Sequence, residues 1–148
     1  LRCSGSRTTK DWPLIKRGVS FGFLGRFGRS ADLRYLDSAL QSFSLHPGAV
    51  PDGVKMVAVS LMAEDGIEPE PAAYPPVAAL MALLVYWPEE FARLNGPEAC
   101  AEGLGRLETA LEQGEGLDAS IILLMLHARL LHESLKEDYA IEADQEGS

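Results

Sequence analysis

The apolar run from Val77 to Trp87 constrains the fold of this chain more than any other feature. It reads VAALMALLVYW and directly follows Pro75 and Pro76, a residue type favoured in the first turn of a helix. The run is too short to cross a bilayer. A helix that is apolar on every side is buried inside a fold. We therefore expect a central helix surrounded by other elements of the chain.

Several further segments repeat apolar residues at intervals of three and four, which is the spacing of one helical face. Prolines and glycines mark where these segments begin and end. The valines after Pro51 would also suit a strand, but VKMVAVSLMAED lacks alternation, and its Met, Leu and Ala favour a helix. The predicted helices run from an N-cap at Ser30 to His46, from Pro51 to Glu64, from Pro88 to Leu94, from the end of the NGP segment at residues 95–97 to the GEG turn, and unbroken from Leu117 to Leu135.

The predicted fold is all-α: a compact bundle or short α-solenoid of five to six helices packed as antiparallel hairpins, with an extended basic N-terminal arm. The short GEG turn at residues 114–116 predicts that the last two helices form such a hairpin. Gly103 and Gly105 lie inside the preceding helix and predict close helix packing, and Cys100 falls on its apolar side. We expect a basic arm rich in glycine and aromatic residues at 1–29, a helical domain at 30–136 and an acidic tail at 137–148.

Basic and acidic residues are distributed unevenly along the chain. The net charge is −9, but residues 1–34 carry +6 and the remaining 114 residues carry −15. An acidic body repels nucleic acid and anionic membrane, so either contact would have to be made through the arm. The other interpretation is that the arm lies on the acidic body of its own chain or of a neighbouring subunit. We favour this second interpretation because the complementary charge is present in the same chain.

The segment GVSFGFLGRFGRS at residues 18–30 carries two motifs that resemble catalytic or binding loops. Gly18 to Gly22 spell the G-x-S-x-G of a hydrolase nucleophile elbow, but neither a strand before Ser20 nor a helix directly after it is predicted. The glycine spacing fits neither a P-loop nor a dinucleotide fingerprint. A single anion at a helix start near Arg26 and Arg29 remains an alternative to glycines that only loosen the segment.

Histidine and cysteine positions do not predict a metal site, a cofactor or a disulfide framework. His127 and His132 are five residues apart, so they point about 140° away from each other on a helix. We expect His127 to be a half-buried structural residue. Two cysteines, Cys3 and Cys100, favour a reducing, cytoplasmic setting. No catalytic residues converge on one position, so we favour a protein that is not an enzyme, and an enzyme with a pocket near His127 is the least supported alternative.

Aromatic and basic residues interleave along the arm. This pattern is typical of single-stranded nucleic-acid binders, and it also suits an arm whose aromatic rings dock in apolar pockets while its arginines meet an acidic rim. The favoured function is a non-enzymatic helical domain that mediates protein–protein contact or self-association, as in a homodimer. The alternative is a nucleic-acid or anion-binding module that acts through the arm. The candidate binding residues are Trp12, Arg17, Phe21, Phe23, Arg26, Phe27, Arg29 and Arg34.

Overall fold

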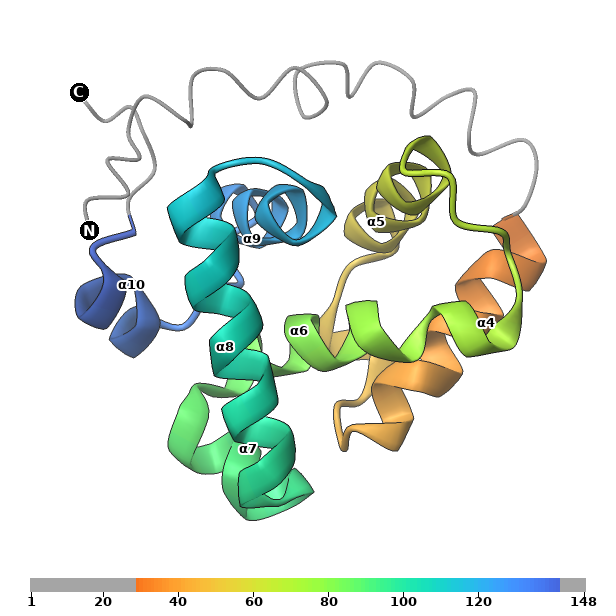
Figure 1. Cartoon of the computed structure of the whole chain (residues 1–148). Helices are drawn as coiled ribbons and strands as arrows, with labels where there is room; N and C mark the ends of the chain where they lie inside the picture. The colour runs from red at the N-terminus through yellow and green to blue at the C-terminus, as the bar shows by residue number, and fades with distance from the viewer. Residues whose placement is uncertain (1–28, 142–148) are drawn as a thin grey trace.

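The computed structural model describes residues 29–141, and within this range it contains seven α-helices and no strand (Figure 1). The predicted all-α class is therefore confirmed. Two short 3-10 helices, Pro47–Ala49 and Pro71–Ala73, lie in the connections on either side of α5. The α-helices are α4 (Arg29–Ser42), α5 (Asp52–Glu64), α6 (Pro75–Tyr86), α7 (Pro88–Asn95), α8 (Pro97–Gln113), α9 (Leu117–His127) and α10 (Glu133–Tyr139).

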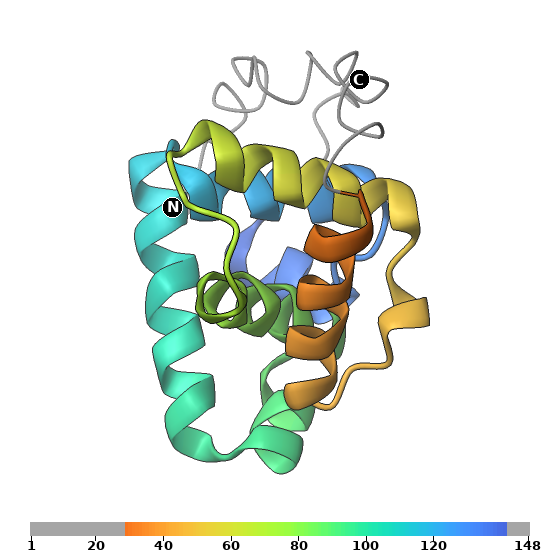
Figure 2. The same cartoon turned by 90° about the vertical axis from the view of Figure 1, so that its right-hand side faces the viewer.

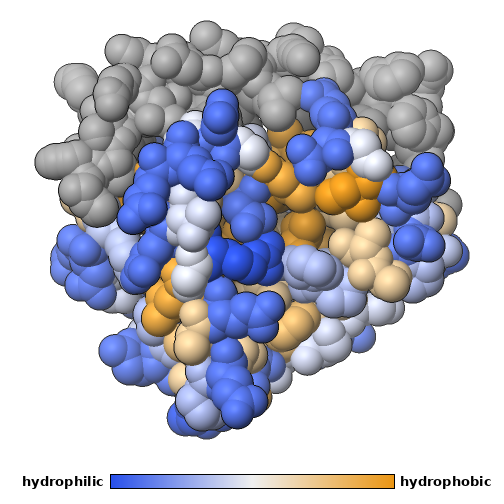
Figure 3. Space-filling model, in the orientation of Figure 1, coloured by the Kyte–Doolittle hydropathy of each residue, from blue (hydrophilic) through white to orange (hydrophobic). Residues whose placement is uncertain are grey.

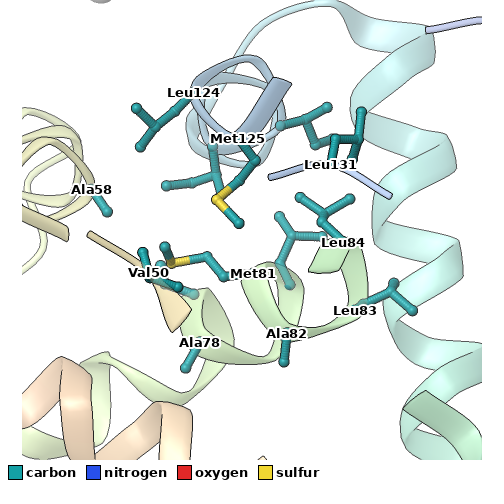
Figure 4. Packing of buried hydrophobic residues seen from close by; sticks show 14 of the residues in the cluster. Val50, Ala58, Ala78, Met81, Ala82, Leu83, Leu84, Leu124, Met125 and Leu131 are labelled. Carbon is teal, nitrogen blue, oxygen red and sulfur yellow. The ribbon is translucent and has the colours of Figure 1, made fainter. Parts of the chain in front are cut away.

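Helix α6 is the centre of the fold, as its composition predicts. It packs against α4, α7, α8 and α9, and Figure 2 shows it end-on between α4 and α8, below a layer formed by α5 and α9. Met81 of α6 and Met125 of α9 point toward each other across this core (Figure 4). Both methionines are fully buried. The apolar side chains around α6 are thus covered by helices that come from both halves of the chain.

Prolines and glycines place most helix boundaries where the sequence predicts them. Prolines occupy the first turn of α6, α7 and α8, and Gly114 ends α8 in the left-handed conformation that glycine adopts without strain. The start of α4 differs from the prediction. Ser30 already lies inside α4 and is not its N-cap. A shift of one or two residues at a helix end is common because terminal turns share hydrogen bonds with the flanking chain.

The predicted unbroken helix from Leu117 to Leu135 is wrong. Helix α9 ends at His127, and Arg129 takes a left-handed φ of 64°. The Leu130 N–H donates to the Met125 carbonyl and closes the end of α9. His132 then begins α10 as its N-cap, and its own N–H donates to the Leu84 carbonyl of α6 at 2.8 Å. A tertiary hydrogen bond to the central helix therefore accompanies the break.

The predicted antiparallel hairpin of α8 and α9 does not form either, because α9 runs across the end of α8 (Figure 2). The crossing is held by Arg106, whose Nε and Nη2 donate to the two carboxylate oxygens of Asp118 at 3.1 and 2.9 Å. Its Nη1 also donates to the Pro76 carbonyl at 2.8 Å. One guanidinium thus connects α8 to the first turns of both α9 and α6.

One of the two glycines inside α8 explains how α8 approaches α6. A Cβ at Gly103 would lie 2.9 Å from Leu83 Cδ2, so the predicted close packing is confirmed there. Gly105 is exposed, and a Cβ would meet no atom within 4 Å. Cys100 is buried, as predicted, and its thiol donates to the Pro88 carbonyl at 3.4 Å. Among the described helices, none has both the length and the apolar composition needed to cross a membrane.

Candidate contact surface

The predicted binding residues fall mostly outside the described part of the chain. Only two of the eight lie within residues 29–141: Arg29 opens α4, and Arg34 is exposed on the same helix. The six that lie outside it are Trp12, Arg17, Phe21, Phe23, Arg26 and Phe27. The described helices therefore show what surface is available to a partner, and the arm remains a prediction.

The histidines and the cysteine do not form a catalytic arrangement in the described helices. His127 is exposed at the end of α9, so the expectation that it is half-buried is wrong. The helix ends there, and the side chain points away from the packed layer. Burial and the nearby Glu89 carboxylate raise the pKa of the Cys100 thiol, which keeps it in the protonated, unreactive form. Between residues 29 and 141, no group of three or more His, Cys, Asp or Glu side chains is placed to hold a metal ion.

A lysine of α5 is turned into the fold. Lys55 is only 4% exposed, and its Nζ lies 2.8 Å from Asp37 Oδ1 of α4 and 3.3 Å from Asp52 Oδ1. It also donates to the Pro47 carbonyl at 3.3 Å. A buried ammonium is stable only when such partners replace its water. Lys55 therefore connects α5 to α4 and to the preceding loop, and it brings no charge to the surface.

The outer side of α5 consequently carries no charge between Asp52 and Glu64, the exposed carboxylates at its two ends. Lys55 is the only charged residue between Asp52 and Glu64. Helical periodicity places a second set of residues opposite the buried Ala58 and Met62. These residues are small or apolar and are half-buried or exposed, and they comprise Gly53, Met56, Val59, Ser60 and Ala63. A surface helix of a soluble protein ordinarily carries charged residues on this side.

Helix α9 has the same character and lies beside α5. No charged residue occurs between Asp118 and His127, and every residue from 119 to 126 is buried. Met125 points to α6 (Figure 4), and helical periodicity turns Ala119, Leu123 and Leu126 about 100–160° away from it around α9. We call the outer residues of α5, together with this side of α9, the α5–α9 surface, and its exposed positions all belong to α5. No described helix lies over it on the side away from α6 (Figures 1 and 2).

The acidic residues gather elsewhere. The outward side of α8 carries four exposed carboxylates, and no described basic residue pairs with Glu98, Glu102 or Glu112. Figure 3 shows this division: hydrophilic colour covers α8, and hydrophobic colour gathers between α8 and α5. Glu108 is the fourth of these carboxylates and accepts a hydrogen bond from the Tyr139 hydroxyl at 2.8 Å. The described helices thus present one acidic side and one uncharged side.

Trp87 is a second unusual feature, at the junction of α6 and α7. It adopts φ 69° and ψ 158°, close to the conformations of the helix-capping glycines Gly96 and Gly116. This region of backbone space is almost exclusive to glycine. The indole lies against the His132 imidazole with ring centroids 4.2 Å apart. His132 Nδ1 accepts from the Ser134 N–H at 3.1 Å, so this histidine serves as a helix cap beside the tryptophan.

No protein-family model, no curated protein and no solved structure matches this chain significantly. Its function is therefore inferred from its own surface. Sequence reasoning concentrated on the arm and missed the α5–α9 surface. The signal was present, because GVKMVAVSLMA and ASIILLML contain a single charged residue between them. What could not be read from sequence is that Lys55 is buried and that the two helices are neighbours.

Proposed function

We propose that this protein is a non-enzymatic helical domain that makes protein–protein contact by self-association through the α5–α9 surface. The observation that carries the proposal is the absence of outward charge on α5 between Asp52 and Glu64, where the one lysine is buried against Asp37 and Asp52. Contiguous uncharged surface of this kind is typical of interaction sites. A second copy supplies a matching uncharged surface when two chains meet across a two-fold axis.

The size of the surface predicts a weak, reversible association. Two adjacent helices of this length cover about 20 Å by 20 Å, from the helical rise and diameter. That area lies at the low end for specific interfaces, where contacts are transient and concentration-dependent. The acidic side of α8 also favours contact through the α5–α9 surfaces, since like charges oppose any contact between two copies of α8. The α5–α9 surfaces can meet without this repulsion.

A nucleic-acid partner finds less support in the described helices. Four of the six lysine and arginine side chains between residues 31 and 141 form ion pairs with carboxylates of the same chain, namely Lys55, Arg93, Arg106 and Lys136. Phosphate binding requires cations that are free to displace counterions. Arg34 is exposed on α4 and could contribute to such a contact, together with the arm. Binding to a DNA or RNA oligonucleotide that weakens steeply with salt would favour this alternative.

Sedimentation velocity on the full chain across the micromolar range tests self-association. We expect the weight-average mass to rise with concentration toward that of a dimer. Ala63→Glu introduces a charge on the exposed side of α5 and should abolish the rise. Ala101→Glu is the matched control, because it makes the same change at an exposed alanine on the acidic side of α8. A chain that remains monomeric throughout, or an association that Ala63→Glu leaves unchanged, would overturn the proposal.

A further inference from the structure

We propose that residues 18–28 of the same chain occupy the α5–α9 surface in the monomer and compete there with the second copy. The inference rests on the proposed function, because it concerns the regulation of the same surface. The proposed occupant is the segment GVSFGFLGRFG, which precedes α4. Self-association then requires this segment to leave the surface.

The attachment point of the segment lies close to the surface. Helix α4 begins at Arg29 and packs against α5, and its first turn lies directly beneath α5 in Figure 2. A chain of ten residues spans up to about 35 Å when extended, whereas α5 is about 20 Å long. Residues 18–28 can therefore reach along the whole of α5 without any movement of α4.

The side chains of the two partners are complementary in size. The segment carries three aromatic rings, Phe21, Phe23 and Phe27, separated by glycines and Leu24. The surface combines small residues with apolar ones, and it includes Gly53, Ser60, Ala63 and Ala119 together with Met56, Val59 and Leu123. Large rings fit over small residues because the backbone of the helix can then be approached closely. Aromatic rings bury large apolar areas and dominate the energetics of such contacts.

Charge complements this apolar contact at the ends of α5. Asp52 and Asp65 are exposed at its two ends. Arg17 directly precedes the segment, Arg26 lies between Phe23 and Phe27, and the two arginines are nine residues apart. Nine residues span up to about 30 Å, so the two guanidiniums can reach carboxylates at opposite ends of the helix. The basic segment is thus attracted to the ends of α5, whereas a second copy brings no exposed basic residue to them on its own α5.

Tethering gives the segment an advantage over a second copy. A short linker holds its ligand at an effective concentration in the millimolar range. A weak association between copies then proceeds only through the fraction of chains whose surface is open, and the apparent Kd rises in proportion. Loosening the segment should therefore strengthen self-association, because it increases that fraction.

The test uses the full chain with Phe21, Phe23 and Phe27 each replaced by serine. We expect its self-association Kd to be at least tenfold lower than that of the parent chain. In dilute monomer, we also expect Met56 to be oxidised by peroxide faster than in the parent chain, with the fully buried Met81 as an internal reference. Trp12→Ser removes an aromatic residue outside the segment and serves as the matched control, with both readouts unchanged.

The outcomes separate this inference from the proposed function. If Ala63→Glu abolishes self-association but the triple serine variant alters neither the Kd nor Met56 oxidation, the segment does not occupy the surface and only this inference fails. If the triple variant weakens self-association, the segment belongs to the contact between copies, and competition is excluded. If Met56 oxidation accelerates but no chain self-associates at any concentration, the segment covers the surface while the proposed function fails.

Discussion

The Lys55 ammonium lies 2.8 Å from Asp37 Oδ1, and this ion pair connects α5 to α4 on the inner side of α5. It has two consequences for the molecule. It fixes the rotation of α5 about its own axis, since a buried lysine cannot turn outward without losing its partners. It also leaves the outer side of α5 without charge between Asp52 and Glu64, which is the feature from which the contact surface is inferred.

Removal of the Asp37 carboxylate should therefore destabilise the fold. We expect Asp37→Asn to lower the free energy of unfolding by about 1–2 kcal/mol, because the buried ammonium loses its nearest anion. Asp52→Asn is the matched control. Asp52 also pairs with Lys55, but its side chain is 71% exposed against 36% for Asp37, and we expect a loss of less than about 0.5 kcal/mol. Urea denaturation of both variants measures the difference, and equal losses would contradict the unequal roles assigned to them.

Trp87 supplies a prediction about backbone strain. Because its φ of 69° and ψ of 158° suit glycine, we expect Trp87→Gly to be more stable than Trp87→Ala by about 1–3 kcal/mol. Both variants lose the stacking on His132, but only glycine also relieves the strain. Thermal unfolding followed by circular dichroism measures the order of the two variants. An alanine variant at least as stable as the glycine variant would show that the backbone at this position is unstrained.

The two glycines of α8 should respond differently to alanine. Gly105→Ala should stabilise the protein by about 0.5–1 kcal/mol, since alanine favours the helix and the site is open. Gly103→Ala brings the same helical preference but places a Cβ 2.9 Å from Leu83 Cδ2 in a buried contact. We therefore expect it to be the less stable of the two variants in the same denaturation experiment. The reverse order would mean that α6 and α8 are less closely packed than described.

Two tyrosines make stability sensitive to alkaline pH. Burial and the adjacent Asp32 carboxylate, whose Oδ1 accepts the Tyr74 hydroxyl at 3.2 Å, raise the pKa of Tyr74. Burial and the hydrogen bond to Glu108 raise the pKa of Tyr139 to about 12. The folded state therefore favours the neutral phenols, and the stability they contribute is complete below their unfolded pKa of about 10 and falls as pH rises above it.

Tyr74→Phe provides the test, because phenylalanine cannot ionise. We expect the free energy of unfolding to fall less steeply above pH 10 in Tyr74→Phe than in the parent chain, although Tyr139 still contributes to the slope. Tyr35→Phe serves as the control, since Tyr35 packs against Tyr74 with ring centroids 5.6 Å apart but lies outside the hydrogen bond to Asp32. Identical slopes in Tyr74→Phe and the parent chain would exclude Tyr74 as a source of the pH dependence.

Much of the secondary structure could be predicted from local sequence. The prolines before α6, α7 and α8 mark their starts, and the apolar circumference of α6 marks it as central. These features act within a few residues of the chain, so they do not depend on the rest of the fold. The α5–α9 surface could be predicted only in part. The scarcity of charged residues in the two segments can be read from the sequence, but the adjacency of two helices that are distant in sequence cannot.

The sequence by itself determined the helical class, most helix starts and the identity of the core helix, because these follow from backbone propensity and apolar periodicity. The tertiary structure decided where the last helix breaks, since the Arg129 turn is accompanied by the hydrogen bond from His132 to Leu84. It also decided that α9 crosses α8, through the pair of Arg106 and Asp118, and that Lys55 faces inward. Each of these depends on a partner distant in sequence, whose position is set only when the helices pack.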